Sequence, residues 1–434
     1  MRVLLKTILF GRNRDIEESS VIFNAIAGIL NASQSIVFVM LALRLSTVEE
    51  AGYLTIAFAI GNLLLTIGKY GIRNYQVTDA VEKYSFYGYL ETRKVTTTLM
   101  FICGVLYCFF QFFLNYAEIK KIIIIISILV LYLFESYEDV YEAELQRMGR
   151  LDVASMIYII RWGATFIFYG ISFLIFHNLI IALVGSCLIN GASCIYLLNI
   201  CFKTGKIKLK KINKVECSLI IKMSSVLCIS SFLIMFIVNC PKYIIDIKMS
   251  AAEQTYFGII VMPIFGIELL SNFIFQPYLH SMSQSILKYE YKKFYMWIVK
   301  QVIFIFLLTA LVIICANWLG IPILSWIYDI DLSLYHTELL LVLAGGGVLA
   351  GITYFGVVLT LLRKQKYMMC CYFIIAVLET IILYFVVGKY GIRGAVIAYD
   401  AVALLLLIML LFYILVVLKR LEKRNIIYKK DVNS

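Results

Sequence analysis

Twelve runs of about 20 mainly apolar residues restrict the possible folds of this chain more than any other feature. A helix needs about 20 apolar residues to cross the hydrocarbon core of a membrane. Strands of a membrane barrel are shorter, about 10 residues, and alternate apolar with polar side chains. The sequence therefore predicts an all-α integral membrane protein with twelve transmembrane helices. The predicted spans are Val21–Leu43, Gly52–Ile72, Val95–Tyr116, Ile122–Val140, Val153–Ile175, Leu179–Phe202, Leu219–Asn239, Phe257–Pro277, Met296–Leu319, Leu339–Leu362, Tyr367–Val387 and Ile392–Leu418.

The overall composition agrees with this class. Hydrophobic residues make up 62% of the 434 residues and charged residues 15%, against roughly 45–50% and 25% in soluble domains. The formal net charge of +12 does not indicate nucleic-acid binding, because the basic residues lie in short loops and form no continuous patch. The cysteines and histidines show no ligand-like spacing, so we expect neither a metal nor another cofactor.

The distribution of charge predicts the orientation in the membrane. A loop at 203–214 contains six lysines and no acid between two apolar runs. Such loops stay in the cytosol, and most other Lys and Arg residues fall on the same side if both termini are cytosolic. We therefore expect a multi-pass protein of the bacterial plasma membrane whose two ends face the cytosol.

The basic loop also divides the spans into two sets of six. We predict a cytosolic tail (1–20), an N-lobe (21–202), a basic cytosolic linker (203–218), a C-lobe (219–418) and a second basic tail (419–434). A Ser-x-x-Glu capping pattern begins at Ser46 after the first span and at Ser250 after the seventh. Its recurrence at the same step of each half favours two pseudo-symmetric lobes related by a parallel repeat.

Polar side chains in the first span are candidates for a substrate cavity. Asn24, Asn31 and Ser35 lie seven and four residues apart and therefore share one helical face. They either line a cavity, as intramembrane polar groups often do, or form hydrogen bonds to a neighbouring helix.

Three basic residues are further cavity candidates. Arg161 lies within the fifth span, where a guanidinium suits phosphate binding; the alternative is an ion pair with Glu135 or Glu138 of the fourth span. Arg44 and Lys242 end the first and seventh spans, which are equivalent positions of the two halves. Snorkelling to the interface is their simpler explanation.

Three acids lie within predicted spans of the second half: Glu268, Glu379 and Asp400. Carboxylates inside a bilayer carry protons or ions in transporters, so these residues are candidates for ion coupling. The alternative is pairing with a cation such as Lys222. Glu268 also follows Pro263, where we expect a kink.

Three segments resemble the polysaccharide transporter family of lipid-linked oligosaccharide flippases, of the O-antigen or capsular repeat-unit type. They are Tyr70–Asp79 (YGIRNYQVTD), Asn239–Asp246 (NCPKYIID) and Gly391–Ala395 (GIRGA). The family belongs to the multidrug/oligosaccharidyl-lipid/polysaccharide exporter superfamily. The resemblance extends over the whole chain in length, helix count and motif order.

The resemblance implies two six-helix lobes arranged as a V around a central cavity, with alternating access. The substrate would be an oligosaccharide on a polyprenyl pyrophosphate, and glycosyltransferases and a polymerase would be pathway partners. The family's cationic cavity fits Arg161, Arg44 and Lys242, so we expect Arg161→Ala to lower glycan export without unfolding the protein.

Two alternatives stay open. One is a multidrug exporter of the same superfamily. The other is a membrane glycan polymerase or ligase, which would need a substantial outer catalytic loop that the sequence lacks. Because the sequence shows no phosphate loop and no Ser/His/Asp constellation, we expect a protein that is not an enzyme.

Overall fold

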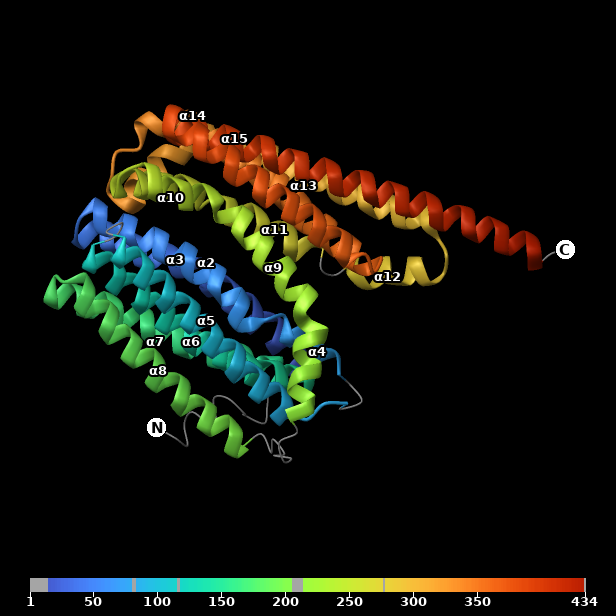
Figure 1. Cartoon of the computed structure of the whole chain (residues 1–434), viewed down its shortest axis with the longest axis horizontal. Helices are drawn as coiled ribbons and strands as arrows, with labels where there is room; N and C mark the ends of the chain where they lie inside the picture. Colours follow the sequence, from blue (N-terminus) through green and yellow to red (C-terminus); the bar gives the residue numbers. More distant parts are fainter. Residues whose placement is uncertain (1–14, 80–82, 115–117, 205–213, 276–277, 433–434) are drawn as a thin grey trace. The chain divides into compact units, whose positions relative to one another are not determined.

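A computed structural model describes residues 15–79, 83–114, 118–204, 214–275 and 278–432, and every regular element in these segments is a helix (Figure 1). The expected all-α membrane fold is confirmed. The α-helices are α2 (Ile16–Leu45), α3 (Val48–Lys69), α4 (Ile72–Thr78), α5 (Phe86–Phe113), α6 (Ile119–Arg147), α7 (Leu151–Phe176), α8 (Leu179–Thr204), α9 (Lys214–Lys248), α10 (Ala251–Val261), α11 (Ile264–Phe275), α12 (Leu279–Leu287), α13 (Tyr291–Tyr328), α14 (His336–Leu361) and α15 (Gln365–Val432). A short 3-10 helix, η2 (Ser333–Tyr335), precedes α14.

The predicted spans coincide with these helices. Ten helices of the described residues are long and apolar enough to cross a membrane. One of them, α15, contains two predicted spans on either side of Gly391, where the backbone leaves helical geometry (φ 59°, ψ −147°). The remaining predicted span, Ile122–Val140, lies on α6, which is less apolar because it carries several acids.

The chain divides into two compact units, unit 1 (Met1–Met235) and unit 2 (Phe236–Ser434). The division falls inside α9, whereas we predicted the link between lobes at 203–218. Most of that predicted linker (205–213) lies outside the described residues, as does most of the N-terminal tail. The first part of α9 belongs to unit 1 because Ile220 is buried in a core cluster with Ile72 and Phe86.

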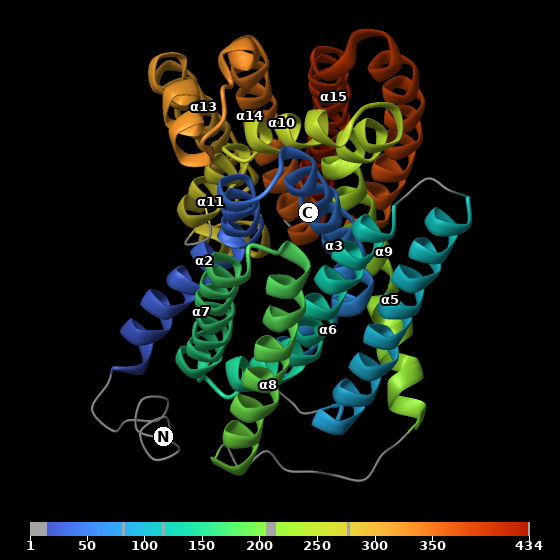
Figure 2. The same ribbon diagram turned by 90° about the vertical axis from the view of Figure 1, so that its left-hand side faces the viewer.

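Helix α6 is the centre of unit 1. It packs against α3, α4, α5, α7 and α8, and helix α2 packs against α3 and α7 (Figures 1 and 2). Glycines allow the close approach of neighbours: a Cβ at Gly61 would lie 2.8 Å from the Tyr132 ring, and one at Gly191 would lie 2.5 Å from the Phe134 ring. Residues on α6 are therefore surrounded by protein on several sides.

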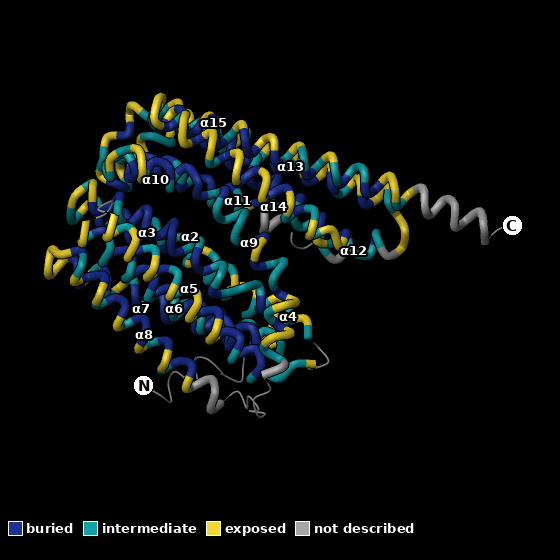
Figure 3. The backbone as a smooth tube through the Cα atoms, viewed as in Figure 1, coloured by how far each residue is buried: buried dark blue, intermediate teal, exposed yellow. Residues whose placement is uncertain are grey.

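Helix α14 has the corresponding place in unit 2, with α10, α11, α13 and α15 as its neighbours. The glycine run at 345–347 makes this packing possible, because a Cβ at Gly346 would lie 3.2 Å from Ile264. Exposed turns lie on the outward sides of α13 and α15 (Figure 3). Helix α6 carries the fourth predicted span of the first half, and α14 carries the fourth predicted span of the second half. The equivalent span is therefore central in each unit.

Two local predictions have different outcomes. The expected kink in the eighth span is confirmed, since α10 ends at Val261 and α11 begins at Ile264, with Pro263 between them. The Ser250 capping box is also present. The matching box at Ser46 is wrong by one residue: Thr47 is the N-cap of α3 and accepts from the Glu50 backbone N–H, while the Ser46 hydroxyl contacts the Glu50 carboxylate.

Candidate functional site

Four acids form a buried stripe on α6, which we call the acidic stripe: Glu135, Glu138, Asp139 and Glu142. Their spacing of three and four residues puts them on one face of the helix. Each side chain belongs to a residue that is at most 8% exposed. Four carboxylates at this density repel one another and lose their hydration, so they need cations nearby.

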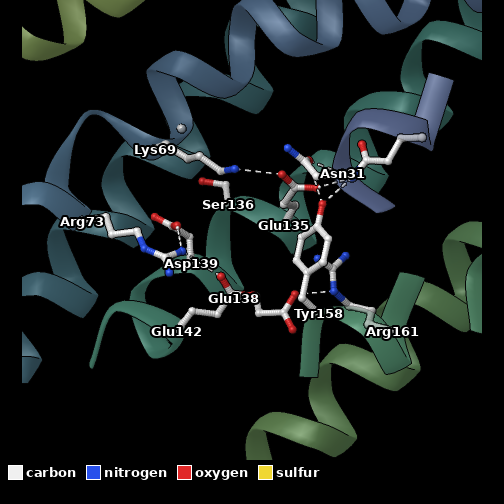
Figure 4. Close-up of polar contacts among 12 residues, drawn as sticks. Asn31, Lys69, Arg73, Glu135, Ser136, Glu138, Asp139, Glu142, Tyr158 and Arg161 are labelled. Atoms are coloured by element: carbon white, nitrogen blue, oxygen red, sulfur yellow. Dashed lines mark hydrogen bonds and ion pairs between the residues drawn. The ribbon is translucent and has the colours of Figure 1, made fainter. Parts of the chain in front are cut away.

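The cations come from four different helices (Figure 4). Lys69, the last residue of α3, lies 2.8 Å from Glu135. Arg73 of α4 lies 3.0 Å from Asp139 and 2.9 Å from Glu142.

The other two cations are fully buried. Arg93 of α5 lies 2.5 Å from Asp139 and also donates to the Gly68 carbonyl. Arg161 of α7 forms an ion pair with Glu138. The four positive charges therefore balance the four negative charges of the acidic stripe. The ion pairs connect helices α3, α4, α5 and α7 to α6.

Arg161 lies inside the helix bundle with no exposed surface. Its Nη1 donates to Asn190 at 3.0 Å, and Asn190 donates to Thr165 at 2.9 Å. In the part of the chain that the structure describes, the Arg161 Nη2 and the Glu138 Oε1 have no hydrogen-bond partner. The predicted cavity residue is thus in the arrangement that we considered as its alternative, an ion pair with Glu138.

The polar face of α2 meets the acidic stripe. Gln34 Nε2 lies 3.1 Å from Glu135, 2.6 Å from the Tyr158 hydroxyl and 3.3 Å from Asn31 Oδ1. The Tyr158 hydroxyl in turn donates to Asn31 Oδ1 at 2.8 Å. Asn31 therefore forms the hydrogen bond to a neighbouring helix, α7, that was one of its two predicted roles. It is also exposed, and its place in a cavity stays a prediction.

The other predicted residues of the first span are not part of this network. Asn24 is exposed and Ser35 is half-buried. Arg44 is exposed in the last turn of α2. The structure brings Asn31 and Arg161 together through Tyr158, which donates to Asn31 and whose ring lies 5.4 Å from the Arg161 guanidinium.

The segment Tyr70–Asp79, one of the family-like motifs, has a structural explanation. Tyr70 and Gly71 adopt left-handed backbone angles, which end α3 and start α4 in a new direction. Arg73 then reaches the acidic stripe, and Gln76 donates to the Val140 carbonyl of α6 at 3.0 Å. Burial alone lowers the pKa of Arg73, but Asp139 and Glu142 raise it above its ordinary value.

Asp79, the last residue of this motif, holds the start of the segment that leads to α5 through hydrogen bonds. Asp79 accepts from the backbone N–H groups of Lys83 and Tyr84 at 2.9 and 3.0 Å, and from the Tyr89 hydroxyl at 3.0 Å. Burial raises the pKa of the Asp79 carboxyl, but these bonds lower it below its ordinary value.

The three acids predicted for ion coupling all lie in unit 2, and their surroundings differ from those of the acidic stripe in unit 1. Glu379 is fully buried, and among the described residues neither of its carboxylate oxygens has a hydrogen-bond partner. Asp400 Oδ1 has none there either, whereas Glu268 accepts from Thr353 at 3.3 Å. Within the described part of unit 2, none of the three forms an ion pair.

Two basic residues of the second half were named from the sequence, Lys242 for the cavity and Lys222 as a partner of these acids. The Lys242 ammonium lies 6.0 Å from the centre of the Phe265 ring. Lys222, which we considered as a partner, is exposed and belongs to the unit 1 part of α9. Unit 1 therefore neutralises its buried acids, while the acids of unit 2 are left uncompensated in the described residues.

Sequence reasoning missed most of the network in unit 1. It named Glu135, Glu138 and Arg161 but neither Lys69 nor Arg93. A usable signal was present, because four acids at helical spacing near the end of an apolar run indicate a buried face that requires cations.

Comparison with known proteins shows what the fold resembles. No protein-family model matches the chain, and no curated protein matches it. Several solved structures, in contrast, match it. An inward-facing multidrug resistance MATE family transporter of the MOP superfamily has a TM-score of 0.68 and 10% identity, with coverage of 97% of this chain and 99% of that one.

Two further structures agree. A MATE protein in a bent conformation has a TM-score of 0.64 and 11% identity over 95% of this chain and 97% of its own. A MOP superfamily transporter from Pyrococcus furiosus, for which a reversed polarity of the binding pocket suggests a different function, has a TM-score of 0.59 and 12% identity over 96% and 98%. Nearly the whole chain therefore has the fold of these membrane transporters.

Proposed function

We propose that this protein is a flippase of the MOP superfamily fold. It moves a polyprenyl-pyrophosphate-linked oligosaccharide from the cytosolic to the outer leaflet of a bacterial plasma membrane by alternating access. The observation that carries this proposal is the shared fold along 97% of the chain, together with acids such as Glu379 placed inside the apolar helices of unit 2. Such groups are costly in a bilayer and typically belong to transport pathways.

The physical requirement of this substrate supports the proposal. A polyprenyl tail can stay in lipid, whereas the sugars and the pyrophosphate need a polar route, since burying unpaired polar groups in hydrocarbon costs several kcal/mol each. The motifs Tyr70–Asp79 and Asn239–Asp246 favour this substrate class by their resemblance to the flippase family.

The uncompensated acids of unit 2 support ion-coupled transport. Glu379 and Asp400 have carboxylate oxygens without hydrogen-bond partners among the described residues, and such oxygens can take up a proton or another cation during the transport cycle. We expect Glu379→Gln to abolish the dependence of transport on an ion gradient. Glu338→Gln, which changes an acid in the first turn of α14, is the control and should keep that dependence.

The direct test uses the full chain in lipid vesicles with a fluorescent polyprenyl-pyrophosphate-linked oligosaccharide. Transport makes probe from the inner leaflet accessible to a reagent added outside, at a rate above that of protein-free vesicles. Equal rates with and without protein would overturn the proposal.

The second candidate is a multidrug exporter, which the multidrug resistance transporter among the similar structures favours. The same vesicles distinguish it, because a multidrug exporter would move a cationic dye and leave the lipid-linked oligosaccharide in place. A glycan polymerase or ligase would instead lengthen or transfer the glycan, which product analysis of the vesicles would reveal.

Cellular experiments extend the test. A deletion strain of a flippase accumulates unpolymerised lipid-linked repeat units inside the cell, where the glycosyltransferases make them and the polymerase cannot reach them. Tags on the two termini should be accessible only from the cytosol, as the distribution of lysines predicts.

A further inference from the structure

We propose that Lys69 and Asn31 form an oxyanion subsite in unit 1, which binds a phosphate or diphosphate group and is held in place by Glu135. We call it the Lys69–Asn31 subsite. The proposal rests on the proposed function, since it names the part of the substrate that unit 1 recognises, but it is tested by binding and not by transport.

Glu135 fixes the position of the Lys69 ammonium but accepts only one of the ammonium's N–H donors. The Glu135 residue is 3% exposed, whereas the side chain of Lys69 is 37% exposed. Lys69 donates to Glu135 Oε1 at 2.8 Å. An ammonium has three donors, and in the described structure the other two make no hydrogen bond, so Lys69 is partly free for a ligand.

The other oxygen of Glu135 fixes Asn31 through two intermediates (Figure 4). Glu135 Oε2 accepts from Gln34 Nε2, which also donates to the Tyr158 hydroxyl. Because this hydroxyl accepts from Gln34, its own proton is directed to Asn31 Oδ1. The Asn31 Oδ1 atom is thereby occupied as an acceptor. The two N–H donors on Asn31 Nδ2 stay available to a ligand, because the residue is exposed.

Both residues therefore present only donors, and one of them carries a positive charge. This combination matches a ligand that has acceptors alone and a negative charge, as a phosphate does. A diphosphate has oxygens on two linked phosphorus atoms, one for each set of donors, and the Lys69–Glu135 ion pair can stay intact because the ammonium has three donors.

The matched control joins the same two helices, α3 and α6, with the lysine on α6 and the acid on α3. Lys120 pairs with Glu50 at the start of α3, and the side chains are 43% and 10% exposed. This pair resembles Lys69–Glu135 in chemistry and exposure, but no exposed amide like that of Asn31 is bound to Glu50 in the described structure. Loss of the Lys120 charge should therefore leave oxyanion binding unchanged.

The experiment measures binding of farnesyl diphosphate to the full chain in nanodiscs of zwitterionic lipid. Lys69→Gln should weaken binding about tenfold or more, because it removes a charge-assisted hydrogen bond. Lys69→Arg should stay within about threefold of the unmodified chain, since the charge is kept. Tyr158→Phe should weaken binding by a few-fold, because the Asn31 amide is then free to turn.

Two competitors identify the source of the bound group. Competition by inorganic diphosphate supports recognition of the oxyanion itself. Competition by nanodiscs that contain an anionic phospholipid supports the same subsite with a membrane headgroup as its occupant. Equal affinities of Lys69→Gln and Lys120→Gln, with both variants showing the thermal midpoint of the unmodified chain, would overturn the proposal.

The outcome is independent of the proposed function. Dye export together with Lys69-dependent diphosphate binding would remove the flippase and keep the subsite. Oligosaccharide transport with diphosphate binding that is insensitive to Lys69→Gln and Tyr158→Phe would remove the subsite and keep the flippase.

Discussion

Arg161 of α7 lies against Glu138 of α6, and neither residue has any surface exposed. The pair is buried in unit 1, where each charge depends on the other for compensation. This changes the expected result of Arg161→Ala. We first expected a folded protein with lower export, whereas the buried pair predicts a loss of folding stability.

Arg161→Ala should lower the unfolding free energy by about 3–5 kcal/mol, because Glu138 is left as an unpaired buried charge. The measurement is the thermal midpoint of the purified protein in detergent. The double variant Arg161→Leu with Glu138→Leu should recover most of the loss, since no charge then stays buried. A single variant as stable as the unmodified chain would contradict this assignment.

Asp139 should matter more for stability than Glu142, although both belong to the acidic stripe. Asp139 pairs with Arg73 and with the fully buried Arg93, whereas Glu142 pairs only with Arg73. We expect Asp139→Asn to cost about 3 kcal/mol or more and Glu142→Gln about 1–2 kcal/mol. Denaturation of both variants under one condition decides the order, and equal losses would show that Arg93 does not depend on Asp139.

The loop held by Asp79 should loosen in acid. The pKa of Asp79 is lowered below its ordinary value of 3.8 in the folded chain. Its stabilising effect is therefore complete above that pH and disappears as the pH falls through the folded-state pKa. Hydrogen exchange at the Lys83 and Tyr84 amides should accelerate, relative to their intrinsic rates, as the pH is lowered through this range.

The variant Asp79→Asn gives the matched comparison. It should speed exchange of the same two amides already at pH 7, by a factor equivalent to about 1 kcal/mol, and should remove the acid-dependent loosening. Asp331→Asn changes a carboxylate that likewise accepts from a backbone N–H, that of Ser333 in unit 2, and should leave these amides unchanged. Protection that is identical in Asp79→Asn and the unmodified chain would refute the role of Asp79.

Gly345 should be needed for the position of the Asp400 carboxylate. A Cβ at Gly345 would overlap Asp400 Oδ1, whereas a Cβ at Gly346 would meet only the apolar side chains of Ile264 and Ile267 at 3.2 Å or more. Gly345→Ala should therefore impair transport more than Gly346→Ala, by about tenfold if coupling depends on Asp400. Transport assays on both variants, at matched amounts of folded protein, test this difference.

The class of fold could be predicted from the sequence because length and hydrophobicity determine what crosses a membrane. Within the described residues each of the twelve predicted spans lies mainly on helix, the ends at Tyr116 and Pro277 being outside them, and Pro263 identified the break between α10 and α11. The first capping box was misplaced because Ser46 and Thr47 are both able to cap α3, and only the backbone geometry selects Thr47.

The arrangement of charges could not be predicted, because it depends on which faces of separate helices meet. Arg93 was assigned to a cytosolic loop, yet α5 begins at Phe86 and turns Arg93 inward to Asp139. Lys69 looked like an ordinary residue at the end of a span. Its importance depends on Glu135, which is 66 residues away in the sequence.

Helix α9 has a consequence for dividing this protein experimentally. A cut between residues 205 and 213 would separate the sequence at its basic loop, but the second fragment would keep residues 214–235, which belong to unit 1. In the intact chain Glu216 accepts from the Ser85 hydroxyl at 2.7 Å, and Tyr75 donates to the Met223 carbonyl at 2.9 Å. The first fragment alone would therefore have an incomplete core, and the two halves should fold only when they are produced together.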